Sequence, residues 1–220
     1  MIAKTFERRG PAGLFLALFA FCLTAGAQAE TETRKTEPFH AVSFEGSWTV
    51  DVTVGKENSV VLEGNKDTLA KVTTEVVDGQ LRVRLEHSTF SLFRREDTHG
   101  LVAHVTLPQL TAFALAGSGD ASVTGLNGGK ASFALDGSGD LKAVGKLDSV
   151  DLVVNGSGDA DLSALQSAKA SAVVNGSGDA VVNPTDTLAA VVNGSGRVKY
   201  LTEGAKVTSV IHGSGMVEKR

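Results

Sequence analysis

Apolar and polar residues alternate in short segments along most of the chain, and in the C-terminal half each segment ends at a glycine. Segments such as Phe113–Leu115, Leu152–Val154 and Ala190–Val192 are aliphatic or β-branched and stop just before a Gly-Ser-Gly tripeptide. Such segments are typical of β-strands. Nothing between the tripeptides is long enough or periodic enough for a helix. The pattern therefore predicts an all-β protein.

The Gly-Ser-Gly tripeptide occurs six times, and its first glycine recurs every 18 to 20 residues. A fixed period near 20 residues indicates a solenoid whose units pack on their neighbours. Because the units are strand-like, we expect a parallel β-helix with coils of about 19–20 residues and one tripeptide at the same corner of each coil. Glycine suits a tight corner because it adopts positive φ without a Cβ clash. The predicted structural corner residues are Gly117, Gly119, Gly137, Gly139, Gly156, Gly158, Gly176, Gly178, Gly194, Gly196, Gly213 and Gly215.

Side chains alternate between the two faces of a strand, so the sequence also predicts which stacked positions face the core. The first predicted inward column lies two residues before each tripeptide: Leu115, Leu135, Val154, Val174, Val192 and Ile211. The second lies four residues before it: Phe113, Phe133, Leu152, Ala172, Ala190 and Ser209. A third follows the tripeptide: Val123, Ala143, Leu162, Val182 and Tyr200. An apolar column should point outward: Ala114, Ala134, Val153, Val173, Val191 and Val210.

Polar residues flank the tripeptide on both sides. Asn155, Asn175 and Asn193 precede it, and stacked asparagines can form a hydrogen-bonded ladder when coils lie about 4.8 Å apart. The residues that follow it form a predicted column of stacked carboxylates, which we take as the candidate binding residues: Asp120, Asp140, Asp159 and Asp179.

Mutual repulsion between these carboxylates must be relieved. The side chains could turn into water or accept hydrogen bonds from their own corner amides, and we favour this reading. The alternative is a Ca²⁺ ion, which prefers carboxylate oxygens. Calcium-binding β-rolls repeat every nine residues, however, so we expect no metal site and no cofactor.

The N-terminal half is strand-rich but less regular. Residues 44–47 and 62–67 contain two degenerate corners whose glycines, Gly46 and Gly64, are 18 residues apart. We therefore expect the same coil from residue 39 to residue 220, with an irregular loop at 87–100. The alternative is a small antiparallel meander that caps the helix.

The first 29 residues have the pattern of a secretory signal peptide. Lys4, Arg8 and Arg9 precede an apolar segment at 13–25, and Ala27-Gln28-Ala29 matches a cleavage site. We expect a flexible leader at 30–38. Cys22 is the only cysteine and lies within the signal, so the exported chain would contain neither disulfides nor thiolate chemistry.

Charge and composition argue against two classes of function, nucleic-acid binding and catalysis. The net charge is −4, and removal of the signal, which carries a net +2, leaves −6. An acidic exported protein is a poor partner for nucleic acid. The sequence shows no metal-spaced His/Cys cluster and no nucleophile–His–Asp set, so we expect no enzymatic activity. The alternative is a polysaccharide-acting enzyme, because Asp residues two coils apart would lie about 9.6 Å from each other, near the spacing in inverting glycosidases.

The recurring Val-Val-Asn-Gly-Ser-Gly-Asp, together with Phe44–Trp48 and Val76–Leu81, resembles the head GIN domain family over residues 37–220. That family is labelled as autotransporter adhesins. The resemblance implies a right-handed parallel β-helix at the bacterial surface or in the periplasm, and it implies no catalytic residues.

Together these observations predict an exported, non-enzymatic binding or adhesion module that is periplasmic, secreted or on the outer surface. The expected partner is a protein or a glycan of the cell envelope. A further alternative is a structural envelope protein that self-associates end to end through its last coil, whose edge the sequence leaves without a capping helix.

Overall fold

The computed structural model describes residues 29–86 and 100–220. The predicted signal peptide and the predicted loop at 87–100 therefore lie outside the described residues, apart from Ala29 and Gly100. The elements are β1 (Glu30–Arg34), β2 (Ala41–Glu45), β3 (Thr49–Val54), β4 (Ser59–Gly64), α1 (Lys66–Leu69), β5 (Val72–Val77), β6 (Gln80–Leu85), β7 (Val102–Leu107), β8 (Ala112–Gly117), β9 (Asp120–Asn127), β10 (Lys130–Gly137), β11 (Leu141–Gly156), β12 (Ala160–Gly176), β13 (Asp179–Gly194), β14 (Arg197–Tyr200), β15 (Lys206–Gly213) and β16 (Met216–Lys219).

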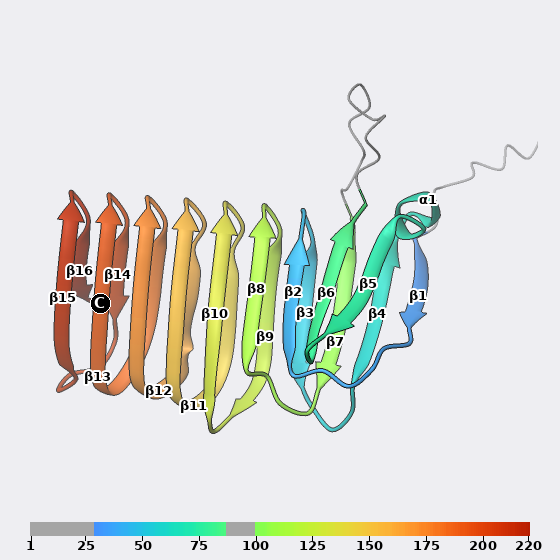
Figure 1. The fold of residues 1–220 in the computed structure, drawn as a ribbon. Coiled ribbons are helices and arrows are strands. Elements are labelled where there is room, and N and C mark those ends of the chain that lie inside the picture. The colour runs from blue at the N-terminus through green and yellow to red at the C-terminus, as the bar shows by residue number, and fades with distance from the viewer. Residues whose placement is uncertain (1–28, 87–99) are drawn as a thin grey trace, which may run out of the picture.

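The C-terminal half is a regular stack of coils, drawn from green to red in Figure 1. Each coil runs parallel to the next and in register, so that Gly137 pairs with both Gly117 and Gly156. Gly176, Gly194 and Gly213 continue the same column. The predicted parallel β-helix, with all six corners on one side, is confirmed.

Two glycines per corner are required by the distance between coils. Gly137 has φ 129°, and a Cβ there would lie 2.2 Å from the carbonyl oxygen of Gly117. A Cβ on Gly139 would lie 1.9 Å from the carbonyl oxygen of Gly119. Any larger residue at either position would force neighbouring coils apart, because the backbone of one corner rests directly on the next.

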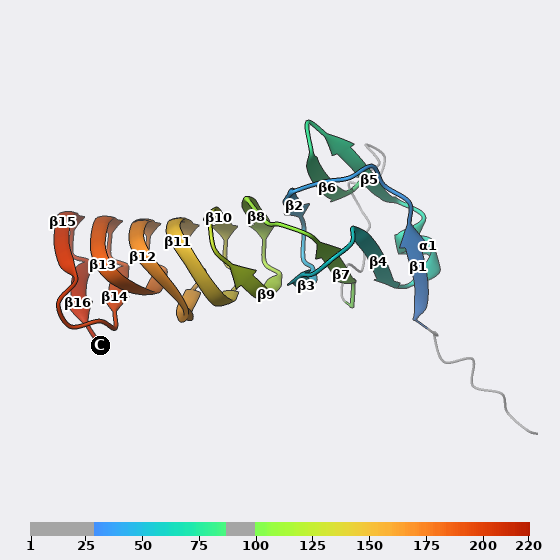
Figure 2. The same cartoon turned by 90° about the horizontal axis from the view of Figure 1, so that it is seen from below.

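Each coil has two faces that pack against each other. In Figure 2, β2, β8, β10 and β15 lie along one face, and β3, β9, β14 and β16 lie along the other. The long strands β11, β12 and β13 pass from one face to the other, and their register shifts at the bend. Apolar side chains from both faces fill the space between them and form one continuous core.

The predicted inward columns are buried through most of the stack. Leu115, Phe133, Val154, Leu162 and Val182 are each at most 1% exposed. The prediction is wrong in the last coil, where Ile211 is 42% exposed and Ser209 is exposed as well. The reason is that, within the described residues, β15 pairs only with β13 and has no strand on its other side.

The first degenerate corner belongs to the same stack. Gly46 has φ 118°, and its backbone N–H donates to the carbonyl oxygen of Ala116 in the next coil. Strands β2 and β3 pair in parallel with β8 and β9, respectively. On the other side they pair with β6 and β7, which follow them in sequence. The β6–β7 coil therefore lies outside the β2–β3 coil.

The prediction of a second degenerate corner, at Gly64, is wrong. Gly64 ends β4, which pairs antiparallel with β7 and with β1. The chain then enters α1, whose first turn is capped by the Asn65 side chain accepting from the Asp67 N–H. Strand β5 is also antiparallel, joined to β6 by a tight turn at Asp78-Gly79, where both residues have positive φ. The capping arrangement that was the alternative therefore applies to β1, β4 and β5.

The expected flexible leader at 30–38 is also corrected. Glu30–Arg34 form β1, because β4 offers an edge with which they pair along their whole length. The Arg34 guanidinium further fixes this strand by donating to the carbonyl oxygen of Leu69, 2.9 Å away.

Within the described part of the chain, nothing helical is both long and apolar enough to cross a bilayer.

Candidate functional site

The four candidate aspartates stack on one outer face of the solenoid, at the point where the chain leaves the glycine corner. We call them the Asp column (Asp120, Asp140, Asp159, Asp179). The residues that follow them pair in register from coil to coil, with Leu141 between Ala121 and Ala160. The predicted stacking is therefore confirmed.

Backbone amides of the adjacent coil partner these carboxylates. The N–H of Asp140 donates to Oδ1 of Asp120 at 3.3 Å, and the N–H of Asp159 donates to Oδ1 of Asp140 at 3.3 Å. The N–H of Asp179 donates to Oδ1 of Asp159 at 2.9 Å. The sequence predicted bonds to each residue's own corner, but the donor comes from the next coil. Since unit charges about 5 Å apart in water repel by only about 1 kcal/mol, one such bond per carboxylate offsets the repulsion.

A basic pair closes the Asp column at its C-terminal end. Arg197 takes the position that aspartate holds in the previous coils and pairs with Asp179 in register. Its Nε and Nη2 donate to the two carboxylate oxygens of Asp179 at 2.9 and 2.6 Å. These hydrogen bonds raise the pKa of Arg197 above its ordinary value. Lys199 adds a second cation, with Nζ 3.7 Å from Oδ2 of Asp179.

Two hollows lie beside the Asp column on the same face. The larger, of about 300 Å³, is lined by Asp159, Ala160, Asp161, Asp179, Val181, Lys199 and Arg220. The smaller, of about 180 Å³, is lined by Thr49, Val50, Asp51, Asp120, Ala121, Ser122, Asp140 and Lys142. Together they cover six strands that pair one after another: β3, β9, β11, β12, β13 and β14. At about 4.8 Å between strands, this strip is about 24 Å long.

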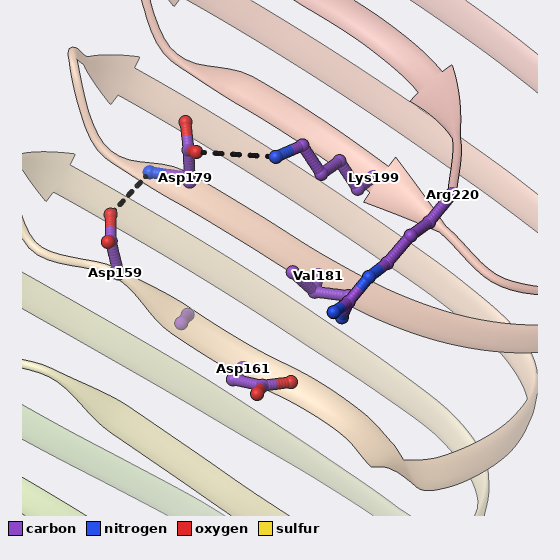
Figure 3. Close-up of a pocket in the computed structure, with 7 residues that line it drawn as sticks. Asp159, Asp161, Asp179, Val181, Lys199 and Arg220 are labelled. Carbon is purple, nitrogen blue, oxygen red and sulfur yellow. Dashed lines mark hydrogen bonds and ion pairs between the residues drawn. The ribbon is translucent and has the colours of Figure 1, made fainter.

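The larger hollow brings opposite charges together. Figure 3 shows Asp159 just before β12 and Asp161 on it, with Lys199 on β14 and Arg220 just after β16, at the other side of Val181. Hydrogen bonds from Ser163, first from its hydroxyl and then from its backbone N–H, lower the pKa of Asp161 against a smaller opposing effect of burial. Arg220 and Lys142 lower this pKa further. The hollow therefore places donors beside acceptors, with Nζ of Lys199 3.7 Å from Oδ2 of Asp179.

The arrangement suits binding of a polar ligand better than catalysis. Three carboxylates of the Asp column accept the same kind of bond from the same kind of donor, so nothing separates an acid from a base. In residues 29–86 and 100–220, no three His, Cys, Asp or Glu side chains are grouped so as to hold a metal ion. The expectation of no metal stays a prediction.

The predicted Asn ladder lies on the other outer face and is confirmed. Nδ2 of Asn175 donates to Oδ1 of Asn155, and Nδ2 of Asn193 donates to Oδ1 of Asn175, both at 2.7 Å. Asp136 accepts from Asn155 at one end, and Nδ1 of His212 lies 3.1 Å from Oδ1 of Asn193 at the other. Since the amides bond mainly to one another, the ladder stiffens the stack.

Sequence reasoning missed the cations of this site and Asp161. Lys142, Asp161 and Lys199 each lie two residues after the Asp column position of their coil, so strand alternation places them on the same outer face. That signal was present in the repeat. Arg220 carried no such signal, because its place beside Asp161 depends on how the last coil stacks on two earlier ones.

Comparison with known proteins agrees with this fold. The model of the family described as "Putative auto-transporter adhesin, head GIN domain" matches residues 38–204. A putative adhesin from Bacteroides fragilis is 19% identical with a TM-score of 0.73, over 89% of this chain and 98% of that chain.

Two further solved structures are similar at a lower level. A putative adhesin from Parabacteroides merdae is 17% identical with a TM-score of 0.55, over 88% of this chain and 96% of that one. A putative lipid binding protein from Parabacteroides distasonis is 20% identical with a TM-score of 0.54, over 87% and 96%. At these identities the likeness shows the fold alone. No curated protein matches the chain.

Proposed function

This chain belongs to the family described as putative auto-transporter adhesins with a head GIN domain, and from that membership we propose that it is an exported, non-enzymatic adhesion module of the bacterial envelope. Two of the similar solved structures, from Bacteroides fragilis and Parabacteroides merdae, are themselves named putative adhesins, in keeping with the family description. The family name also supports export, in agreement with the signal-like first 29 residues.

We place the binding surface on the strip formed by the Asp column and its two hollows. The observation that carries this assignment is the larger hollow, where Asp159 and Asp161 face Lys199 and Arg220 on a rigid scaffold. Hydrogen-bonded strands fix the backbone of Asp161 and of Lys199 on either side of Val181, so these two residues are held on one face before a ligand arrives. Preorganised polar groups lower the entropic cost of binding.

A glycan fits this surface better than a protein segment does. The strip offers alternating acceptors and donors for hydroxyl groups, whereas its apolar lining is limited to Val50, Ala121, Ala160 and Val181. Peptide recognition by strand addition needs a free sheet edge, and the strip lies on the face of paired strands. We therefore expect a hydroxyl-rich envelope polysaccharide, bound without help from Ca²⁺.

A glycan array tests this proposal, with the wild-type protein and with Lys199→Ala. Loss of one charge-assisted hydrogen bond of about 1.5 kcal/mol should weaken binding about tenfold. Lys130→Ala is the matched control, because Lys130 forms an exposed ion pair with Asp151 on the other face. A chelator should change nothing. Binding that Lys130→Ala and Lys199→Ala weaken equally, or an array without any bound glycan, would contradict the proposal.

A further inference from the structure

The last coil, β15 with β16, departs from the earlier coils in what it places at inward positions. Ser209 pairs with Ala190 and stands in the column that begins with Phe113 and Phe133. Lys219 pairs with Tyr200, which itself pairs with Val182. Two columns that are apolar through the stack therefore end in a hydroxyl and an ammonium group.

The inward direction of Lys219 follows from strand alternation. Val217, two residues earlier, packs against the core, so Lys219 lies on the same side of β16. Its Nζ forms an ion pair with Glu203, in the turn that precedes β15. The side chain of Lys219 is 40% exposed and that of Glu203 is 86% exposed, so the pair lies at the open end of the core.

This end of the solenoid would otherwise accept another strand. Within the described residues, β15 pairs only with β13, and β16 pairs only with β14. Both strands therefore present unpaired backbone groups along the solenoid axis, next to the apolar side chains of Val207 and Ile211. An open edge with apolar neighbours is a template for a second chain.

We propose that Ser209 and the Lys219–Glu203 pair block this edge. Any strand that continued the stack, from whatever source, would cover Lys219 and separate it from water, which is unfavourable for an ammonium group. Inward-pointing charges at sheet edges prevent pairing in this way. On this proposal the protein stays monomeric, in contrast to the alternative of end-to-end self-association through the last coil. This inference is independent of the proposed ligand.

Sedimentation velocity over a range of protein concentrations tests the proposal. The wild-type protein should sediment as a monomer throughout. Ser209→Ala/Lys219→Val restores apolar residues to both columns, so its sedimentation coefficient should rise with concentration toward that of a dimer formed by two copies of the same end. Lys206→Val is the matched control. It removes an exposed lysine from the side of β15 that faces away from the core, and this variant should stay monomeric.

Either of two results would overturn the proposal: a wild-type protein that dimerises through β15 or β16, or a double variant that remains monomeric while folded. Circular dichroism establishes that the variants fold. Should the double variant fail to fold, Lys219→Met, which keeps the length of the side chain and removes its charge, repeats the test with the same expected association.

Discussion

Arg197 donates two hydrogen bonds, of 2.9 and 2.6 Å, to the carboxylate of Asp179. In the next coil, Arg197 occupies the position that is equivalent to that of Asp179. The relationship ends a column in which every earlier aspartate is partnered by a backbone amide instead. One coil of the repeat thus has an arginine at the aspartate position, so that the column of negative side chains ends with a positive one.

We predict that Arg197→Ala makes folding stability more dependent on salt. Without the guanidinium, the Asp179 carboxylate loses the two hydrogen bonds that offset its repulsion from Asp159, and added salt screens that repulsion. The urea midpoint of the variant should fall below that of the wild type at low ionic strength and approach it at high ionic strength. Equal midpoints at all salt concentrations would show that the column is not under electrostatic strain.

Gly137→Ala should destabilise the protein by at least about 3 kcal/mol, since strain at positive φ adds to steric overlap with the neighbouring coil. A Cβ at this position meets the Gly117 carbonyl oxygen at 2.2 Å. Gly128→Ala is the control: Gly128 has φ 72° but nothing within 4 Å of the added Cβ, so only about 1–2 kcal/mol is expected. Chemical denaturation measures both, and comparable losses would contradict the close stacking.

Asn175→Ala should cost about 1–2 kcal/mol, because it removes two bonds from the middle of the Asn ladder. Asn127→Ala provides the comparison, since Asn127 is exposed and lies outside the ladder. Its urea midpoint should stay close to that of the wild type. The prediction fails if the two variants unfold at the same urea concentration.

The pH dependence of folding stability should reveal the lowered pKa of Asp161. Its pKa lies below the ordinary value of 3.8 in the folded state, chiefly through Ser163. A carboxylate with a lowered pKa stabilises the fold fully above the unfolded pKa and loses that contribution as the pH falls through the folded one. The stability difference between wild type and Asp161→Asn should therefore be constant at neutral pH and shrink below about pH 4. A difference that widens on acidification would contradict the assignment.

The sequence predicted what repeats from coil to coil. Gly117 and its equivalents, the inward columns and the Asn ladder all follow from local sequence, because residues one period apart become neighbours by the symmetry of the stack. The same logic failed where the repeat stops. Ile211 has the right residue type for the core but no coil to cover it.

Long-range pairing was not predictable in the same way. Gly64 follows a corner-like sequence, yet β4 runs antiparallel because it completes the sheet beside β7. Likewise, β6 and β7 lie outside β2 and β3 because they pair with the edges of β2 and β3 that face away from β8 and β9. No local sequence pattern predicts which edge a strand pairs with. The pairing of Arg220 with the larger hollow belongs to the same class, since it joins segments about 60 residues apart in the chain.

Amide NMR shifts upon titration with the glycan selected on the array test the central claim most directly. The N–H groups of Asp159 and Asp179 bond to carboxylates of the Asp column, so a ligand that engages those carboxylates must shift both resonances. We predict shifts at these two amides and at Lys199, with the Asn ladder unchanged. Shifts confined to the Asn155–Asn193 face, or binding without any change at Asp159 and Asp179, would contradict the account.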